Sequence, residues 1–367
     1  MSRRICVYCD LWESGGIESF LFNTLSRMDL SGMEIDLVAA EIRESIFSKP
    51  LEEKGVRFIE LSGSTRNIPK NHREFRKLLR SRNYSVIHIN AFQGMAFYYA
   101  HLGRAAGVSK ILVHSHNSGL RNSLLKREKL LLHKAYSVRY AEDVTDYWAC
   151  SRLAAEFLFP DSVMKQQGFI FVPNAVDIER FCFDPTVRTR IRKELGVEEK
   201  LVLGNVGRLC EQKNQSFLLD VLSGLINRGM DCNLLLVGSG PAMEELKRKA
   251  EELNLQKSVI FTGVSSHVEE LLCAMDVFLF PSLFEGLPIS VIEAQASGLP
   301  VIYHDILAEE AAIMPDFSVL PLEVEKWVEK ILSTKRNKQR EAAALKMKQT
   351  LFDIDSLSSW LEKEYRG

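Results

Sequence analysis

The sequence predicts an α/β protein of two doubly wound parallel-sheet domains, and three observations carry that prediction. Its 367 residues exceed what one ordinary hydrophobic core accommodates and suit two α/β domains. The apolar runs are short and continuous rather than alternating, as expected of strands covered by helices on both faces. Helical patterns separate these runs, and a β-α-β-α order gives parallel strands.

The expected strands and helices follow one another through the chain. The first half holds strand-like runs at 3–9, 34–40, 56–61, 84–90, 110–116, 146–150 and 168–173. The second half holds such runs at 200–209, 232–240, 258–263, 276–282 and 299–305. Helical patterns stand at 16–28, 72–82, 124–136, 242–253 and 324–332. Each half therefore contains enough strands for a sheet of its own.

The periodicity breaks at 172–190, where two prolines interrupt it, and a second strand series begins at Leu201. We therefore expect a first domain at 1–172, a linker at 173–200 and a second domain at 201–345. The last segment, 346–367, is expected to contain a helix that packs back on the first domain.

Composition excludes several classes of protein. No apolar run reaches the roughly 18 residues that span a bilayer, and no long apolar segment precedes Asp10 at the N-terminus. The seven cysteines are scattered and odd in number, as in a reducing compartment, so we expect a cytoplasmic protein. Cys6 and Cys9 form a C-x-x-C, but residues three apart on a strand face opposite sides and cannot share a metal.

Charge is distributed unevenly along the chain. The net charge is −1, yet residues 61–140 hold 15 Lys and Arg against two Asp and Glu. Within that segment a helical pattern carries Lys126, Arg127, Lys129 and Lys134 beside a row of leucines. An anionic membrane surface, on the inner face of the cell membrane, is therefore a candidate partner. The alternative is a surface helix that buries its leucines.

Two glycine-rich turns follow strands and open helices. Gly15 and Gly16 come after the first strand, where backbone N–H groups and a helix N-terminus favour an anion. Gly238 and Gly240 form a similar turn after the second strand of the second half. An ordinary strand-to-helix connection explains either turn equally well, so neither identifies a ligand alone.

Two cations follow the first strand of the second half. Arg208 and Lys213 lie in the loop at the carboxyl end of this strand, where open α/β sheets bind ligands. Cations in that place can neutralise the charge that grows on a leaving diphosphate. The alternative is a solvated loop, in which lysine and arginine are common.

The most specific pattern is the pair Glu285 and Glu293, on either side of an expected helix start near Pro288. A carboxylate in a strand-end loop accepts hydrogen bonds from sugar hydroxyls, and one two turns into the helix accepts both hydroxyls of a ribose. Gly286, Leu287 and Pro288 lead into this helix, whose first N–H groups favour a phosphate. An exposed helix acid with a capping acid is the alternative, which the apolar surroundings disfavour.

Together these stretches resemble glycosyltransferase family 4, the retaining group with the GT-B fold, and within it bacterial exopolysaccharide and capsule transferases of the EpsF type. The matching stretches run in the family's order at 15–23, 114–118, 172–177, 207–214, 237–241, 261–263 and 285–302. The resemblance implies two Rossmann-like domains facing a central cleft. It further implies transfer of a sugar from a nucleotide diphosphate donor, UDP-linked, to a glycan or lipid-diphosphate-linked acceptor in cell-surface polysaccharide synthesis.

The resemblance also implies roles for individual residues of the second half. Arg208 and Lys213 would hold the donor diphosphate, with Glu285 on the transferred sugar and Glu293 on the ribose. We expect these groups to act without a metal or other cofactor, and we expect no nucleic-acid partner. After residue 305 the chain lacks the Gly-rich turn that many relatives carry.

In the first half, the resemblance assigns Gly16 to the phosphate and His116 to the reacting sugar. His114 is the alternative for that histidine. Asp353 and Asp355 form a D-x-D pattern, but they precede an expected helix, where Asp commonly caps the N-terminus. Two other functions stay open: a nucleotide-sugar epimerase of the same fold, and a catalytically silent subunit that needs an associated chain.

Overall fold

The computed structural model describes residues 2–13, 16–65, 67–91, 93–117, 126–285, 287–305, 309–334 and 339–367. The chain divides into two compact units. Unit 1 comprises Met1–Asn174 with Ile354–Gly367, and unit 2 comprises Ala175–Asp353. Each unit has its own parallel sheet and its own hydrophobic core.

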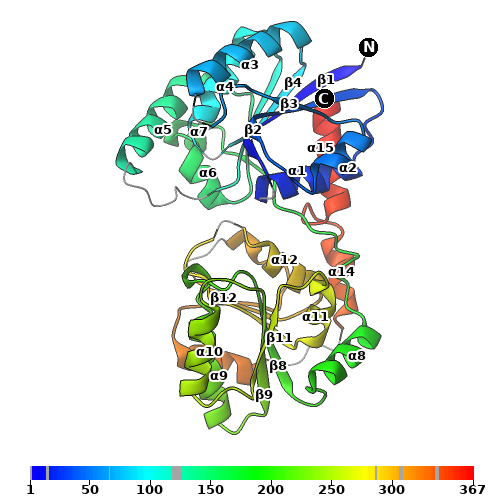
Figure 1. Ribbon diagram of the computed structural model, residues 1–367, viewed down its shortest axis with the longest axis vertical. Coiled ribbons are helices and arrows are strands. Elements are labelled where there is room, and N and C mark those ends of the chain that lie inside the picture. Colours follow the sequence, from blue (N-terminus) through cyan, green and yellow to red (C-terminus); the bar gives the residue numbers. More distant parts are fainter. Residues whose placement is uncertain are drawn as a thin grey trace. The chain divides into compact units, whose positions relative to one another are not determined.

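Among its described residues, unit 1 has one sheet of seven parallel strands in the order β3-β2-β1-β4-β5-β6-β7 (Figure 1). The strands are β1 (Arg3–Trp12), β2 (Met33–Ile42), β3 (Arg57–Glu60), β4 (Val86–Ala91), β5 (Lys110–Ser115), β6 (Asp146–Ala149) and β7 (Ile170–Phe171). The strand order reverses at β1, which pairs with β2 on one side and β4 on the other. Ligands of open α/β sheets bind at the carboxyl ends beside such a reversal.

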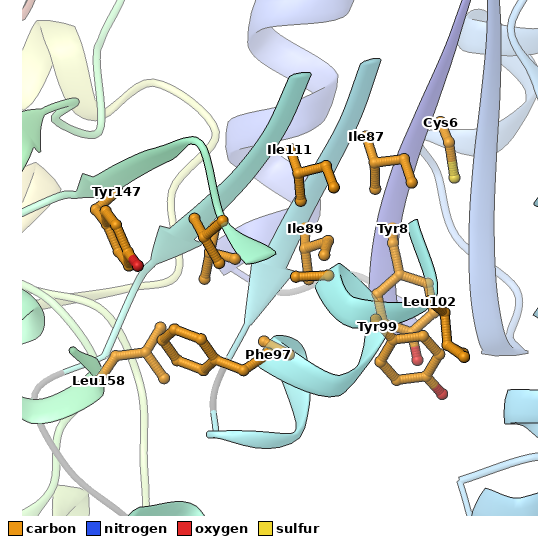
Figure 2. Close-up of a cluster of buried hydrophobic side chains, with 14 of the residues drawn as sticks. Cys6, Tyr8, Ile87, Ile89, Phe97, Tyr99, Leu102, Ile111, Tyr147 and Leu158 are labelled. Atoms are coloured by element: carbon orange, nitrogen blue, oxygen red, sulfur yellow. The ribbon is translucent and has the colours of Figure 1, made fainter. Parts of the chain in front are cut away.

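Helices cover both faces of this sheet, which is why the middle of its central strands is apolar and buried. They are α1 (Gly16–Arg27), α2 (Ser48–Glu53), α3 (Ile68–Arg82), α4 (Met95–Ala105), α5 (Lys126–Tyr140), α6 (Arg152–Leu158), α7 (Asp161–Gln166) and α15 (Ile354–Arg366). Figure 2 shows Phe97 and Leu102 of α4 facing Ile87, Ile89 and Tyr8 of the strands in one buried cluster.

Unit 2 repeats the arrangement with six parallel strands among its described residues, in the order β10-β9-β8-β11-β12-β13. Its strands are β8 (Leu201–Val206), β9 (Cys232–Val237), β10 (Val259–Gly263), β11 (Val277–Phe280), β12 (Val301–His304) and β13 (Phe317–Leu320). Its helices are α8 (Pro185–Leu195), α9 (Gln215–Asn227), α10 (Met243–Glu252), α11 (Val268–Ala274), α12 (Ile289–Ala296), α13 (Val324–Ser333) and α14 (Glu341–Met347). Here the order reverses at β8, between β9 and β11.

The structure differs from the expected domain limits in two places. The interval 173–200, expected as a linker, contains α8, and most of that interval belongs to unit 2. Helix α8 is anchored there because Arg188 and Arg192 both pair with the buried Asp276. The segment 346–367, expected as one helix, is divided at Asp353, and only its C-terminal part belongs to unit 1.

Helix α15 is held to unit 1 by specific contacts of its last turns. The Tyr365 hydroxyl lies 2.7 Å from His88 Nδ1, and Lys110 Nζ lies 2.6 Å from Glu364 Oε2. The Trp360 ring packs on Trp148 with centroids 5.0 Å apart. The chain therefore returns to its first unit after completing the second.

Candidate functional site

Charged groups gather at the carboxyl ends of β8 and β11, the two strands that flank the reversal in unit 2. Lys213 ends a short 3-10 turn after β8 and is followed by Asn214 in the left-handed conformation, which starts α9. Lys213 Nζ lies 2.7 Å from Glu285 Oε1 in the loop after β11, and the two side chains are 17% and 13% exposed. The loops after these neighbouring strands thus present a largely buried ion pair at the place where such sheets bind ligands.

Further contacts hold this pair in place. Gln212 Nε2 donates to Glu285 Oε1 at 3.2 Å, and the Leu283 N–H donates to the Gln212 carbonyl at 2.8 Å. Lys213 Nζ also lies 4.8 Å from the centroid of the Phe280 ring, a favourable cation–π position. An ammonium has three N–H donors, so Lys213 can keep Glu285 and still donate to an incoming anion.

Arg208 lies two residues beyond the end of β8, and its side chain is exposed. Among the described residues, no carboxylate or other acceptor contacts its guanidinium. The two predicted cations therefore share one loop but differ in state, since Lys213 is largely buried and paired whereas Arg208 reaches solvent.

Gly238 and Gly240, predicted as ligand-binding glycines, are required by the packing of two loops. A Cβ at Gly238 would lie 2.1 Å from the Gly207 carbonyl oxygen, and one at Gly240 would lie 2.1 Å from that of Leu209. The backbone of the loop after β9 thus lies directly against the loop that carries Arg208, and any side chain would separate them. Their first role is to position that loop.

Helix α12 begins at Ile289 with Pro288 as its N-cap, as the sequence predicts. Leu287 and Pro288 are buried, and Gly286 lies outside the described residues. Glu293 is the fifth residue of α12, one turn in rather than the expected two. Burial raises the pKa of Glu293 to about 7, Arg180 opposes that rise, and Glu269 adds to it.

In unit 1, the predicted anion-binding turn after β1 is described in part. Gly16 is the first residue of α1 and is exposed, whereas Gly15 lies outside the described residues. The exposed N-terminus of a twelve-residue helix is compatible with an anion there.

The structure distinguishes the two histidines that follow one another on and after β5. His114 is fully buried, with Nε2 3.2 Å from the Val172 carbonyl oxygen. His116 lies just beyond the strand and is only partly buried, with Nε2 2.9 Å from Asn90 Oδ1 on β4. Burial lowers the pKa of His116 to about 3, so the imidazole is neutral near pH 7. His116 therefore suits hydrogen bonding rather than proton donation as an imidazolium.

The D-x-D and C-x-x-C patterns lie in structural surroundings. Asp355 Oδ1 accepts from Arg27 Nη1 at 2.7 Å, and Asp353 is buried where the chain enters α15. Burial raises the pKa of the Cys6 and Cys9 thiols, both of which lie in β1. Within the part of the chain that the structure describes, no three His, Cys, Asp or Glu side chains cluster as metal ligands would. No helix in that part is both long and apolar enough to cross a membrane.

Sequence reasoning missed several residues around the Lys213–Glu285 pair. Gln212, Phe280 and Tyr303 carry no signal of their own, because their place depends on how β8, β11 and β12 align. Asn90, the partner of His116, was likewise read only as part of a strand.

Two doubly wound parallel-sheet units are the architecture of the GT-B fold, and solved structures agree. The structure of HepE from Anabaena in complex with UDP superposes with a TM-score of 0.78, covering 99% of each chain at 18% identity. A glycosyltransferase from Rickettsia africae superposes with a TM-score of 0.77, covering 100% of this chain and 98% of that one at 16% identity.

Sequence comparison adds the family. A model described as Glycosyltransferase Family 4 matches residues 14–180, and one described as Glycosyl transferases group 1 matches residues 200–337. EpsF of Bacillus subtilis is 30% identical over 81% of this chain and 77% of its own. An Escherichia coli UDP-Gal:α-D-GlcNAc-diphosphoundecaprenol α-1,3-galactosyltransferase is 28% identical over 68% of this chain and 65% of its own. The chain belongs to glycosyltransferase family 4 and is a glycosyltransferase.

Proposed function

We propose that the protein transfers a sugar from a UDP-linked donor to a glycan or lipid-diphosphate-linked acceptor, with retention of anomeric configuration, in cell-surface polysaccharide synthesis. The observation that carries the proposal is the largely buried Lys213–Glu285 pair, with Arg208 in the same loop as Lys213. The relatives point the same way, since HepE was solved with UDP and the E. coli relative is named for a UDP-linked donor and a diphosphoundecaprenol acceptor.

The proposed mechanism divides the work between cations and a carboxylate. The sugar–phosphate bond breaks early, and its electron pair goes to the diphosphate, which gathers negative charge while the sugar becomes cation-like. Lys213 and Arg208 stabilise that charge when it is greatest, and therefore raise the rate. Glu285 is held by Lys213 and Gln212, so we assign it to the sugar hydroxyls rather than to nucleophilic attack. The acceptor hydroxyl then attacks from the face that the diphosphate leaves, and its proton passes to an oxygen of the departing diphosphate.

We further propose that transfer needs no divalent metal. Two cationic side chains in the loop after β8 supply the positive charge that a metal would otherwise provide to a leaving diphosphate. Asp355, part of the D-x-D alternative, is paired with Arg27 in unit 1.

Incubation of the purified protein with a panel of nucleotide sugars, in EDTA and without an acceptor, tests the proposal. Slow release of free sugar and nucleoside diphosphate is the expected result. Formation of the 2-epimer instead would indicate the epimerase, and absence of binding to any donor would indicate the silent subunit. Activity that EDTA abolishes and a metal restores would overturn the metal-free mechanism.

We also propose that unit 1 docks on an anionic membrane, at the cytoplasmic face. Helix α5 exposes Leu131 and Val138, which are 71% and 67% exposed, together with Lys134. The side chains of Lys126, Arg127 and Lys129 lie outside the described residues. Helix α5 is anchored instead by the buried His133, whose Nε2 lies 2.8 Å from the Phe157 carbonyl oxygen. Leu131 and Val138 are therefore available for an apolar surface, which favours docking over the alternative of a buried leucine row.

Basic side chains of a nearby helix extend this surface. Helix α3 exposes Arg73, Arg76, Lys77 and Arg80, which recur at helical spacing along one side. Helix α4 packs against both α3 and α5 in the layer shown in Figure 1. Each basic residue near an anionic leaflet adds roughly 1 kcal/mol of attraction.

Flotation with liposomes tests the docking. Recovery should be greater with anionic than with neutral lipid and should fall in Leu131→Ser. Leu345→Ser is the matched control, because Leu345 is 68% exposed on α14 of unit 2. Equal recovery with both lipids would overturn the proposal.

A further inference from the structure

Two hydroxyl groups of unit 2 are buried without a hydrogen-bond partner among the described residues, Tyr303 Oη and Ser282 Oγ. Tyr303 is 1% exposed and Ser282 is 0% exposed. Most buried polar side-chain atoms in folded proteins are paired, and leaving one unpaired costs about 1–3 kcal/mol. Two such hydroxyls, one on β12 and one just beyond the end of β11, therefore indicate a ligand that completes them.

Phe280 connects Tyr303 to the Lys213–Glu285 pair. Phe280 and Tyr303 are register partners of β11 and β12, and their rings stack with centroids 5.7 Å apart at an interplanar angle of 12°. Lys213 Nζ lies 4.8 Å from the centroid of the same Phe280 ring. Glu285 also interacts electrostatically with Tyr303. The Tyr303 ring thus lies against Phe280, the ring that Lys213 Nζ approaches.

Ser282 lies at the beginning of the loop that carries Glu285, two residues beyond Phe280. Residues two apart in an extended segment face the same side, so Ser282 is expected to share the face of Phe280. His304 Nδ1 lies 2.9 Å from the Ser282 carbonyl oxygen, so the local backbone is held without the Ser282 hydroxyl.

We propose that the hydroxyls of Tyr303 and Ser282 hydrogen-bond the transferred sugar and help to select it. The inference rests on the proposed function, in which Glu285 contacts that sugar. A hydroxyl both donates and accepts, which matches the hydroxyls of a sugar. The carboxylates of Glu285 and Glu310 act on Tyr303, so a neutral polyol suits this place better than a phosphate does. Sites built to bond a substrate hydroxyl reject analogues that lack it.

The test compares two ligands that differ only by the sugar. Calorimetry gives Kd for a nucleoside diphosphate and for the matching nucleotide sugar, with wild type, Tyr303→Phe and Ser282→Ala. Each variant should weaken nucleotide-sugar binding about tenfold, as loss of one hydrogen bond does, and leave the Kd of the nucleoside diphosphate within about twofold. Tyr147→Phe is the control, because its buried hydroxyl already donates to the Ala141 carbonyl at 2.5 Å in unit 1.

The outcomes separate this inference from the proposed function. If wild type binds neither ligand, the proposed function fails. If wild type binds both and the variants match it, the hydroxyls are merely hydrated and the inference is overturned. If the variants bind the nucleoside diphosphate and the nucleotide sugar more weakly by the same factor, the inference is overturned as well. If Tyr303→Phe does not fold, Ser282→Ala and a series of deoxy-sugar donors decide. A deoxy donor that lacks the hydroxyl bound by Ser282 binds wild type weakly, and Ser282→Ala should not weaken its binding further.

Discussion

Replacing Lys213 by alanine should lower kcat by about 10²–10³, equivalent to about 2.7–4 kcal/mol of transition-state stabilisation. The magnitude follows from the position of the ammonium, which is 17% exposed and therefore poorly screened by water. Two unit charges about 4 Å apart interact by roughly 4 kcal/mol at an effective dielectric constant near 20. The Coulomb energy between the ammonium and the leaving diphosphate is therefore about as large as the expected loss of transition-state stabilisation.

Steady-state kinetics of donor hydrolysis and of transfer measure the effect, and thermal unfolding confirms that the variant is folded. Lys213→Arg should also be impaired, because the planar guanidinium is bulkier than the ammonium above the Phe280 ring. Lys249→Ala is the matched control, since Lys249 forms a 2.7 Å ion pair with Asp220 between α10 and α9. A folded Lys213→Ala protein with kcat within fivefold of wild type would refute the reasoning.

Three further predictions concern single groups. Arg208→Ala should lower kcat by about 10²–10³ with folding intact, since its guanidinium contacts no acceptor among the described residues; normal turnover would contradict this. His116→Ala should lower turnover strongly and change donor Kd by only a few-fold, and an unaffected turnover would make His116 structural. Burial raises the pKa of Glu293 to about 7. Nucleotide-sugar affinity should therefore weaken about tenfold per pH unit below pH 7, and Glu293→Gln should remove that dependence. Protonation of Glu293 also stabilises the fold. This contribution to the free energy of unfolding is complete below pH 4.5, the ordinary pKa of a glutamate, and is lost as pH rises through about 7. A Glu293→Gln protein with wild-type pH dependence would contradict both.

The sequence predicts the paired sheets because nearly every strand is a short apolar run bounded by turn residues. The sequence does not predict strand β13, because its four residues are half-buried or exposed and include a serine, so the apolar pattern is weak. Helix α8 was assigned to the linker because its surface is rich in arginine and its anchoring depends on Asp276, 84 residues beyond Arg192. Such long-range pairing leaves no local pattern.

The candidate site divides in the same way. Lys213 and Glu285 could be predicted from their strand-end loops, but their direct pairing depends on β8 lying beside β11. For Gly240 the sequence suggested a ligand contact, and the structure provides a packing reason that a turn motif alone cannot reveal. Tyr303 resembles any core aromatic in sequence, because only the packed structure shows that its hydroxyl has no hydrogen-bond partner among the described residues.

The most direct test of the proposed reaction is the configuration of the first product formed from an α-linked nucleotide sugar in the presence of EDTA, followed by proton NMR. A retaining, metal-free transferase should release nucleoside diphosphate together with the α-anomer, before mutarotation, and should form an α-linkage when an acceptor is added. Appearance of the β-anomer first, or activity only after a metal is restored, would contradict the account.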